Sequence, residues 1–391
     1  MLVKAVAHHI FRFAIITCCS LFFVIFPQGA VAQDAGFEIM EDEEVFEARV
    51  EEVLEQKEMT RENGSKAVLQ KLKLKGLEGE RKGQEIIFDG TEIDVFAQHV
   101  YRRGDKVLVS VSKDVDGNDR YYVTDFVRRG SLYVLAAIFV LFILLIGRWR
   151  GLRALLGLVF SFVVILKLII PSIMAGNNPL SVTLAYALLI IVVSTYLVYG
   201  LNKKSTVAVI GTFSGIVIVG AFSVLFTNSA RLAGFAQEET VYLVGLMGGT
   251  LDLRGLLLAG FVIGALGVLD DITISQVSAV REIYETNPRL ARKEIYRKAM
   301  RIGVDHIASM VNTLFLAYAG ASFSLLLLFT FRQAPFLTFS QVVNNEIIAT
   351  EIVRTLVGSI GLALAVPITT WLASFSYQKK IYGETAKNEM R

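Results

Sequence analysis

Four ionisable side chains stand inside long apolar stretches of this chain, where a charged group is costly and usually marks function. Asp270 and Asp271 lie near the end of one apolar stretch, and Asp305 and His306 lie near the start of the next. Carboxylate and imidazole groups together bind cations or relay protons. The pattern therefore predicts an ion-handling site, and it leaves open whether a metal occupies it.

Glycine spacing suggests how these groups are positioned. Gly260, Gly264, Gly267 and Asp271 follow one another at +4, +3 and +4, which places them on one helical face. A glycine face lets a neighbouring helix approach closely, so we expect it to direct Asp271 into the protein, toward the next apolar helix. Neutral polar side chains complete the predicted binding site: Thr273, Ser275, Ser309 and Asn312.

Three other interpretations stay open. The aspartates could have a structural role, capping helices or pairing with nearby cations such as Arg281 or Arg301. Two carboxylates on adjacent helices could also share a proton in an intramembrane aspartyl-type enzyme, but Gly-Val-Leu before Asp270 does not match a Gly-x-Gly-Asp motif. We assign no catalytic residue and expect no enzymatic activity. The third alternative is a membrane-anchored module that binds a partner and transports nothing.

The elements that position the site are apolar stretches of 17 residues or more. As helices they are long enough to cross a hydrocarbon core of ~30 Å. The sequence thus predicts an all-α membrane bundle of about seven helices within residues 131–375, near 131–147, 151–171, 179–200, 205–227, 251–275, 303–329 and 349–373.

Basic residues give this bundle a direction. If residue 130 lies outside, sixteen lysines and arginines fall in the cytoplasmic segments, including the basic segment 276–302 and the tail 376–391, while the outer loops carry Arg231 and Arg332. This asymmetry follows the positive-inside rule. We therefore expect a multi-pass protein of the cell membrane with a cytoplasmic C-terminus.

The N-terminal third is different. Residues 1–32 have a basic start, an apolar run and Ala30-Val31-Ala32, which indicates a signal peptide or an uncleaved signal anchor. Residues 33–130 form an exported acidic domain, with 23 acidic against 15 basic residues over 33–128. Alternating short runs and the turn Asp116-Gly117-Asn118 predict an all-β domain, OB-like or a sandwich. A protein partner could bind there.

Several classes of function are excluded or disfavoured. The only cysteines are Cys18 and Cys19, so disulfides and cysteine-based metal centres are impossible in the rest of the chain. No phosphate-binding loop motif is present, and we expect no cofactor. The basic character of the second half is read as membrane topology, so we expect the lipid bilayer as a partner and no nucleic acid.

The stretch Gly264–Gln276, which reads GALGVLDDITISQ, resembles the signature of the YibE/F-like membrane proteins. The likeness continues through Asp305–Ile307, Asn312–Gly320 and Glu351–Ser359. It implies a polytopic bacterial membrane protein and carries no established biochemical role. From the residues themselves, we predict a transporter or exporter of a small ion or solute that uses the Asp/His cluster for cation or proton coupling.

Overall fold

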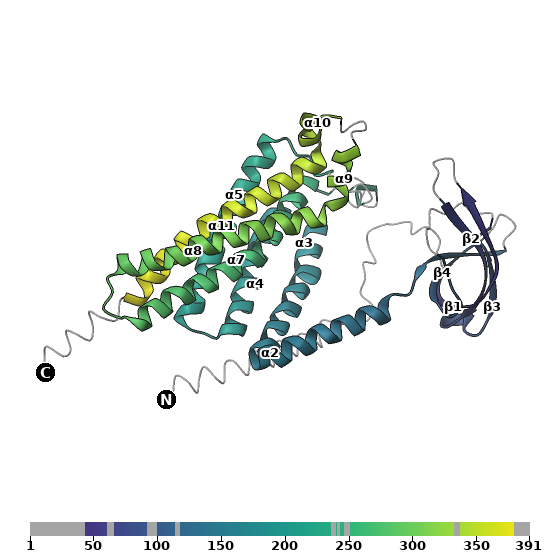
Figure 1. Cartoon of the computed structure of the whole chain (residues 1–391), viewed down its shortest axis with the longest axis horizontal. Helices are drawn as coiled ribbons and strands as arrows, with labels where there is room; N and C mark the ends of the chain where they lie inside the picture. Colours follow the sequence, from purple (N-terminus) through teal and green to yellow (C-terminus); the bar gives the residue numbers. More distant parts are fainter. Residues whose placement is uncertain are drawn as a thin grey trace. The chain divides into compact units, whose positions relative to one another are not determined.

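The computed structural model describes residues 44–60, 66–91, 100–113, 118–235, 240, 243–245, 251–331 and 337–378. The predicted signal segment, 1–32, and most of the predicted tail, 376–391, lie outside these residues. The described chain divides into two compact units, one ending at Phe142 and the other beginning at Ile143. Figure 1 labels their elements.

The first unit contains the predicted all-β domain. One antiparallel sheet has the order β3-β2-β1-β4-β5, and its end strands β3 and β5 also contact each other. The sheet therefore curls into a small, partly open barrel (Figure 1). Its elements are β1 (Glu44–Thr60), β2 (Lys66–Gly76), the 3-10 turn η1 (Gly79–Arg81), β3 (Glu85–Asp89), β4 (Lys106–Lys113) and β5 (Asp119–Phe126).

Alternation along the strands forms the core of this domain. Phe46, Ala48 and Val50 on β1 are buried, as expected when every second side chain faces the interior. Arg81 in η1 helps to close the barrel, because its guanidinium donates to the Tyr121 hydroxyl at 2.7 Å and to Asp119 at 2.7 Å, both on β5.

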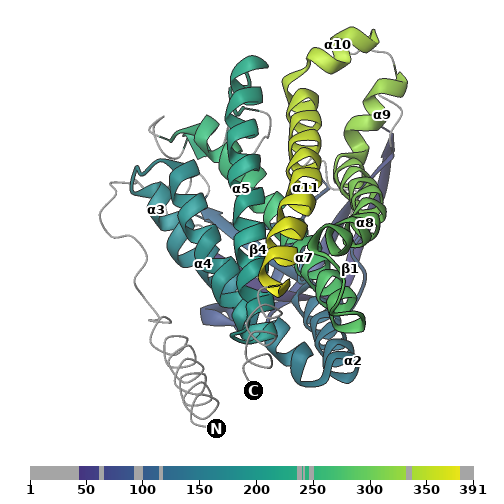
Figure 2. The ribbon, with the colours of Figure 1, turned by 90° about the vertical axis from the view of Figure 1, so that its left-hand side faces the viewer.

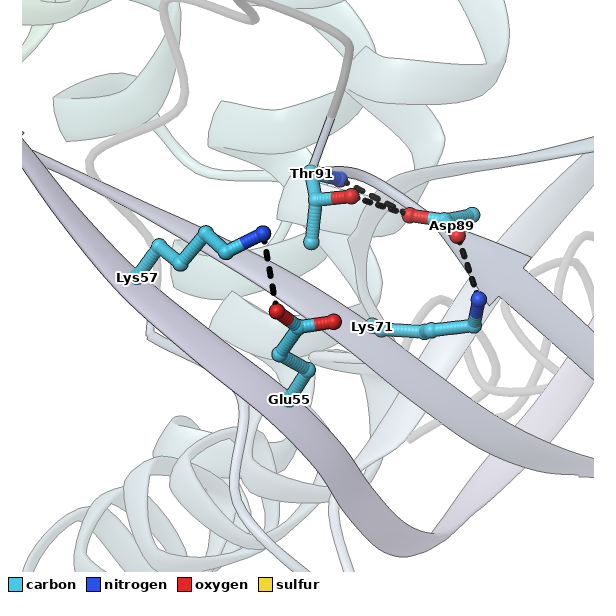
Figure 3. A network of polar contacts seen from close by, with 5 residues as sticks. All are labelled: Glu55, Lys57, Lys71, Asp89 and Thr91. Atoms are coloured by element: carbon cyan, nitrogen blue, oxygen red, sulfur yellow. Dashed lines mark hydrogen bonds and ion pairs between the residues drawn. The ribbon is translucent and has the colours of Figure 1, made fainter.

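A surface network ties β3 to its neighbours. Lys71 on β2 donates to Asp89 at 2.6 Å, and the hydroxyl and amide of Thr91 donate to the same carboxylate (Figure 3). Lys57 pairs with Glu55 on β1 at 2.8 Å. The hydrogen bonds from Lys71 and Thr91 favour the charged carboxylate and lower the pKa of Asp89 from 3.8 to about 2.

The second unit is a helical bundle, in keeping with the predicted membrane domain. Six helices are long and apolar enough to cross a membrane, judged by length and composition. Its elements, with the helix that leads into it, are α2 (Arg129–Val164), the π-helix η2 (Ile165–Ile169), α3 (Ile170–Met174), α4 (Pro179–Tyr199), α5 (Lys203–Ser229), α7 (Leu253–Thr286), α8 (Arg292–Ala321), α9 (Phe323–Phe331), α10 (Phe339–Asn344) and α11 (Glu346–Gln378).

The six counted helices and the seven predicted spans differ at one place. The count takes Arg129–Met174, 46 residues, as a single helix, although a span needs only ~20 residues. Arg148 interrupts it with φ 49 and ψ −130. Gly151 follows shortly after this break, and a Cβ added there would lie 2.3 Å from the Ile143 carbonyl oxygen. The break falls between the predicted spans 131–147 and 151–171.

Close packing in the bundle centres on α5 and α11, which run side by side (Figure 2). A Cβ at Gly211 on α5 would lie 2.3 Å from the Thr369 hydroxyl, and one at Gly361 on α11 would lie 2.2 Å from Val219. Gly215 is held between Leu269 of α7 and Ala365 of α11. Small residues here let three helices meet, as they do in membrane bundles.

The basic segment 276–302 is divided between two long helices. α7 continues to Thr286, and α8 begins at Arg292 and runs without interruption to Ala321. Ile295 and Ala299 are fully buried in a cluster with residues of α7 and α11. The basic residues therefore lie on a helix end that packs onto the bundle.

Candidate functional site

Among the candidate site residues, Asp270 forms a side-chain hydrogen bond to another helix. It projects from α7 toward α4, where the Thr195 hydroxyl donates to its Oδ1 atom at 3.2 Å. The side chain is only partly accessible. In the described part of the chain no lysine, arginine or histidine forms an ion pair with this carboxylate, although eleven described ion pairs were found elsewhere.

A buried polar seam continues from Asp270 along α7. The Thr273 hydroxyl lies 3.1 Å from the Asp270 carbonyl oxygen and 2.5 Å from the Thr212 hydroxyl on α5. Both threonines are fully buried. The seam thus links α4, α7 and α5, and Thr273 lies in the interior with its hydroxyl paired.

One turn farther along α7, Gln276 joins three helices. Its amide nitrogen donates to the Ala299 carbonyl oxygen on α8 at 2.9 Å and to the Thr370 hydroxyl on α11 at 2.8 Å. Gln276 is fully buried. Sequence reasoning did not select this residue, because its partners lie 23 and 94 positions away.

The prediction for the glycine face was wrong. Gly260 and Gly267 have no atom within 4 Å of an added Cβ, and Gly264 meets only the Tyr318 hydroxyl of α8. Asp271, on the same face, is exposed within this chain. The buried face of α7 is instead its aliphatic one, which includes Leu269 and carries Asp270 beside it.

On α8, the predicted polar stripe is largely uncovered. Asp305, Ser309 and Asn312 are exposed, whereas His306 is half-buried, and its Nδ1 atom is buried without a hydrogen-bond partner in the described structure. Ser275 on α7 is also half-buried. Four predicted site residues, Asp271 among them, therefore reach the surface of the single chain.

The predicted site residues of α7 and α8 nevertheless lie at similar depth along the two helices. α7 and α8 touch through Gln276 and Ala299 at one end and through Gly264 and Tyr318 at the other. Asp271 lies between the α7 contacts, and Asp305 and His306 lie between the α8 contacts, as the antiparallel arrangement predicts.

These contacts bear on two open questions from the sequence: whether a metal binds at the Asp/His cluster, and whether the aspartates have a structural role. No group of three or more His, Cys, Asp and Glu side chains among the described residues is close enough to hold a metal ion. The structural interpretation proposed helix capping or pairing with cations such as Arg281 or Arg301, and Arg281 pairs with Glu285 at 2.7 Å. The described side-chain partner of Asp270 is the Thr195 hydroxyl.

A half-buried ion pair lies on α11. Arg354 donates to Glu351 at 2.9 Å, both side chains are about one-fifth exposed, and the guanidinium lies 5.4 Å from the centre of the Phe261 ring. Spacing of three along a helix is typical of an exposed supporting pair. That spacing does not reveal burial, so sequence reasoning gave this pair little weight.

Comparison with known proteins identifies one family. A family model described as YibE/F-like protein matches residues 135–379, which is more than half of the chain. The match includes Asp270, Gln276, Asp305 and Arg354, and it confirms the resemblance seen in the sequence. No curated protein and no solved structure matches the chain.

Proposed function

This chain belongs to the YibE/F-like protein family, and from the geometry of its helices we propose that it is a transporter or exporter of a small ion or solute. The observation that supports this proposal most strongly is Asp270, an acidic side chain among membrane-length helices with a hydroxyl as its described partner. A carboxylate without a cationic partner in such surroundings is costly. It becomes less costly when it takes up a proton or a small cation.

We propose seven crossings, with the helix over Arg129–Met174 divided at Arg148. The small β-barrel then lies outside the cytoplasm, and the basic end of α8 lies inside, in agreement with the positive-inside rule. The cell membrane is the proposed location. The barrel's strand order suits an OB-like fold, and its exposed strands offer a surface for a protein partner.

Within this proposal, Asp270 binds the coupling ion and the Thr195 hydroxyl orients the carboxylate. Asp271, Asp305 and His306, with Ser275, Ser309 and Asn312, form the entry to the site from the exposed face of α7 and α8. Transport requires the ion to leave as well as to enter, and an exposed polar stripe near the half-buried Asp270 carboxylate provides such a route.

Flux measurements in proteoliposomes test the function. The purified chain should carry protons or small cations down an imposed gradient, and Asp270→Asn should abolish that flux because an amide cannot exchange a proton or hold a cation. Asp271→Asn and Asp305→Asn should reduce it. Normal flux in all three variants would reject the site assignment.

A matched pair on α4 separates chemistry from folding. Thr195→Val removes the hydroxyl that contacts Asp270 and should slow flux. Thr183→Val changes a threonine of the same helix that is also fully buried but has no described hydrogen-bond partner, so flux should stay normal. Equal flux in these two variants would remove Thr195 from the mechanism.

A further inference from the structure

A small cavity lies where α7 and α11 begin, away from Asp270. Its volume is about 80 Å³. The described lining consists of aliphatic side chains from the first turns of α7, the open face of Gly260, and the polar side chains of Thr240, Thr350 and Arg354. Gly260 and Asp270 are ten residues apart, or ~15 Å along a helix axis, so the cavity is distinct from the proposed ion site.

The chain segment after α5 is fixed at this cavity. Glu346, at the start of α11, accepts hydrogen bonds from the backbone amides of Ala233 at 2.7 Å and Gly234 at 2.9 Å. Gly234 lines the cavity, and its φ of 92 suits glycine. An added Cβ there would lie 2.6 Å from the Leu253 carbonyl oxygen. The wall is therefore held in place by α7 and α11.

Two polar groups on the wall have no partner. Thr350 is 1% exposed and its hydroxyl makes no hydrogen bond in the described structure. The Nε atom of Arg354 is also buried without one. The two residues are four apart on α11, so they share a helical face. Buried donors of this kind are nearly always satisfied in native proteins, and both line the same cavity.

The described lining of the cavity contributes one positive charge, that of Arg354. The Nη1 end of Arg354 is held by Glu351, and that carboxylate lines a separate, mostly apolar pocket of about 180 Å³ between α8, α9 and α11. Among the described lining residues of the smaller cavity, Arg354 is the only ionised side chain. The unsatisfied groups are an N–H and an O–H, so the missing partner is an acceptor.

We propose that this cavity is a binding site for a small monovalent anion, held by the Arg354 Nε–H group and the Thr350 hydroxyl. A charged donor gives the stronger hydrogen bond, and three leucines of α7 form the apolar part of the lining. Glu351 keeps the guanidinium in place and weakens the site by its own negative charge. The site stands independently of the proposed transport function.

The test is thermal unfolding of the purified full-length chain in sodium chloride and in sodium gluconate at equal concentrations. Chloride should raise the midpoint temperature with a saturable dependence, whereas gluconate is too large for the cavity and should not. Equal midpoints in the two salts would contradict the proposal and indicate that the cavity holds water only.

Variants locate the effect. Thr350→Val should weaken chloride binding about tenfold, the expected effect of losing one hydrogen bond to a charged group, and Thr350→Ser should restore it. Thr355→Val is the control, because that hydroxyl bonds to the Glu351 carbonyl oxygen at 2.8 Å and lines the other pocket. A chloride titration of Thr350→Val that matches wild type would overturn the assignment.

The ion pair of Arg354 and Glu351 allows a test in which two substitutions change chloride binding in opposite directions. Arg354→Gln should abolish the chloride effect, and Glu351→Gln should strengthen chloride binding because a competing negative charge is lost. If Arg354→Gln does not fold, the comparison of valine and serine at position 350 still decides. Weaker chloride binding in Glu351→Gln would contradict the electrostatic argument.

Discussion

Polar residues in the bundle pair across helices, and Gln276 does so most extensively. One amide nitrogen satisfies acceptors on both α8 and α11. In a membrane-length helix this pairing matters, because lipid supplies no alternative partner. The Gln276 amide nitrogen has partners on two helices, its Oε1 atom is buried without a partner in the described structure, and the nearby Asp270 carboxylate has one hydroxyl partner.

Gln276→Leu should therefore destabilise the bundle. It preserves much of the side-chain volume but removes both hydrogen bonds to the neighbouring helices, each worth about 0.5–1.5 kcal/mol. Ser278→Ala is the control, since that hydroxyl bonds only to the Ile274 carbonyl oxygen of its own helix. Thermal unfolding in detergent should show a lower midpoint for the first variant alone, and equal midpoints would reject the role of Gln276.

The β domain should respond to acid through Asp89. Its pKa is about 2 in the fold against 3.8 ordinarily, so its ionised form adds stability that is complete above about pH 4 and is lost as the pH falls through 2. Asp89→Asn should increase hydrogen exchange in β3 at pH 6. The difference from wild type should disappear near pH 2, and a difference that persists there would contradict the linkage.

The sequence predicted Asp270 as a candidate site residue, and it predicted that Asp271, Asp305 and His306 lie at similar depth on α7 and α8, as the contacts between these helices show. It could not identify Thr195 as a partner, because 75 residues separate the two side chains. It also underestimated Arg354. An i, i+3 ion pair has the same sequence whether it lies on a surface or in a protein interior, and only the tertiary contact with Phe261 distinguishes the two.

Helices in the bundle meet through glycines on α5 and α11, and the face of α7 predicted for this role is open. All three helices carry glycines at helical spacing, so periodicity does not determine which of these faces packs against a neighbouring helix. The decisive contacts are Gly211 with Thr369 and Gly361 with Val219. The location of most apolar helices was predictable, since length and hydropathy determine it, whereas the choice of packed face depends on the complete bundle.

Gly215→Ala should destabilise the bundle by about 1–3 kcal/mol through overpacking. The new Cβ would lie 2.9 Å from Leu269 and 3.0 Å from Ala365. Gly267→Ala on α7 meets no atom within 4 Å, and alanine favours helix over glycine, so it should be neutral or slightly stabilising. Thermal midpoints in the same detergent compare the two, and a Gly215 variant as stable as the Gly267 variant would contradict this packing.

Across the whole molecule, charge and hydropathy divide the chain into two regions with different surroundings. The first contains an acidic β-barrel, and the second contains helices of membrane length with basic ends. The barrel contacts the first turn of α2 within its own unit, where Arg129 lies 2.9 Å from the buried Glu47 carboxylate. The domain is therefore joined to the helix by an ion pair as well as by the chain.

Cysteine labelling can test the direction of insertion. With Cys18 and Cys19 replaced by serine, Glu80→Cys in the barrel and Asn287→Cys between α7 and α8 each supply one exposed thiol. A membrane-impermeant maleimide added to intact cells should label position 80 and not position 287. Permeabilised cells should label both. Labelling of position 287 in intact cells would contradict the proposed topology.

The central claim is that Asp270 is the ion-binding carboxylate of the bundle, and ligand-dependent unfolding tests it most directly. The purified full-length chain is heated across a range of pH with small monovalent and divalent cations, beside Asp270→Asn. We expect acid or one of these cations to raise the midpoint temperature of wild type, and Asp270→Asn to lose this response. The same response in wild type and Asp270→Asn would contradict the central claim.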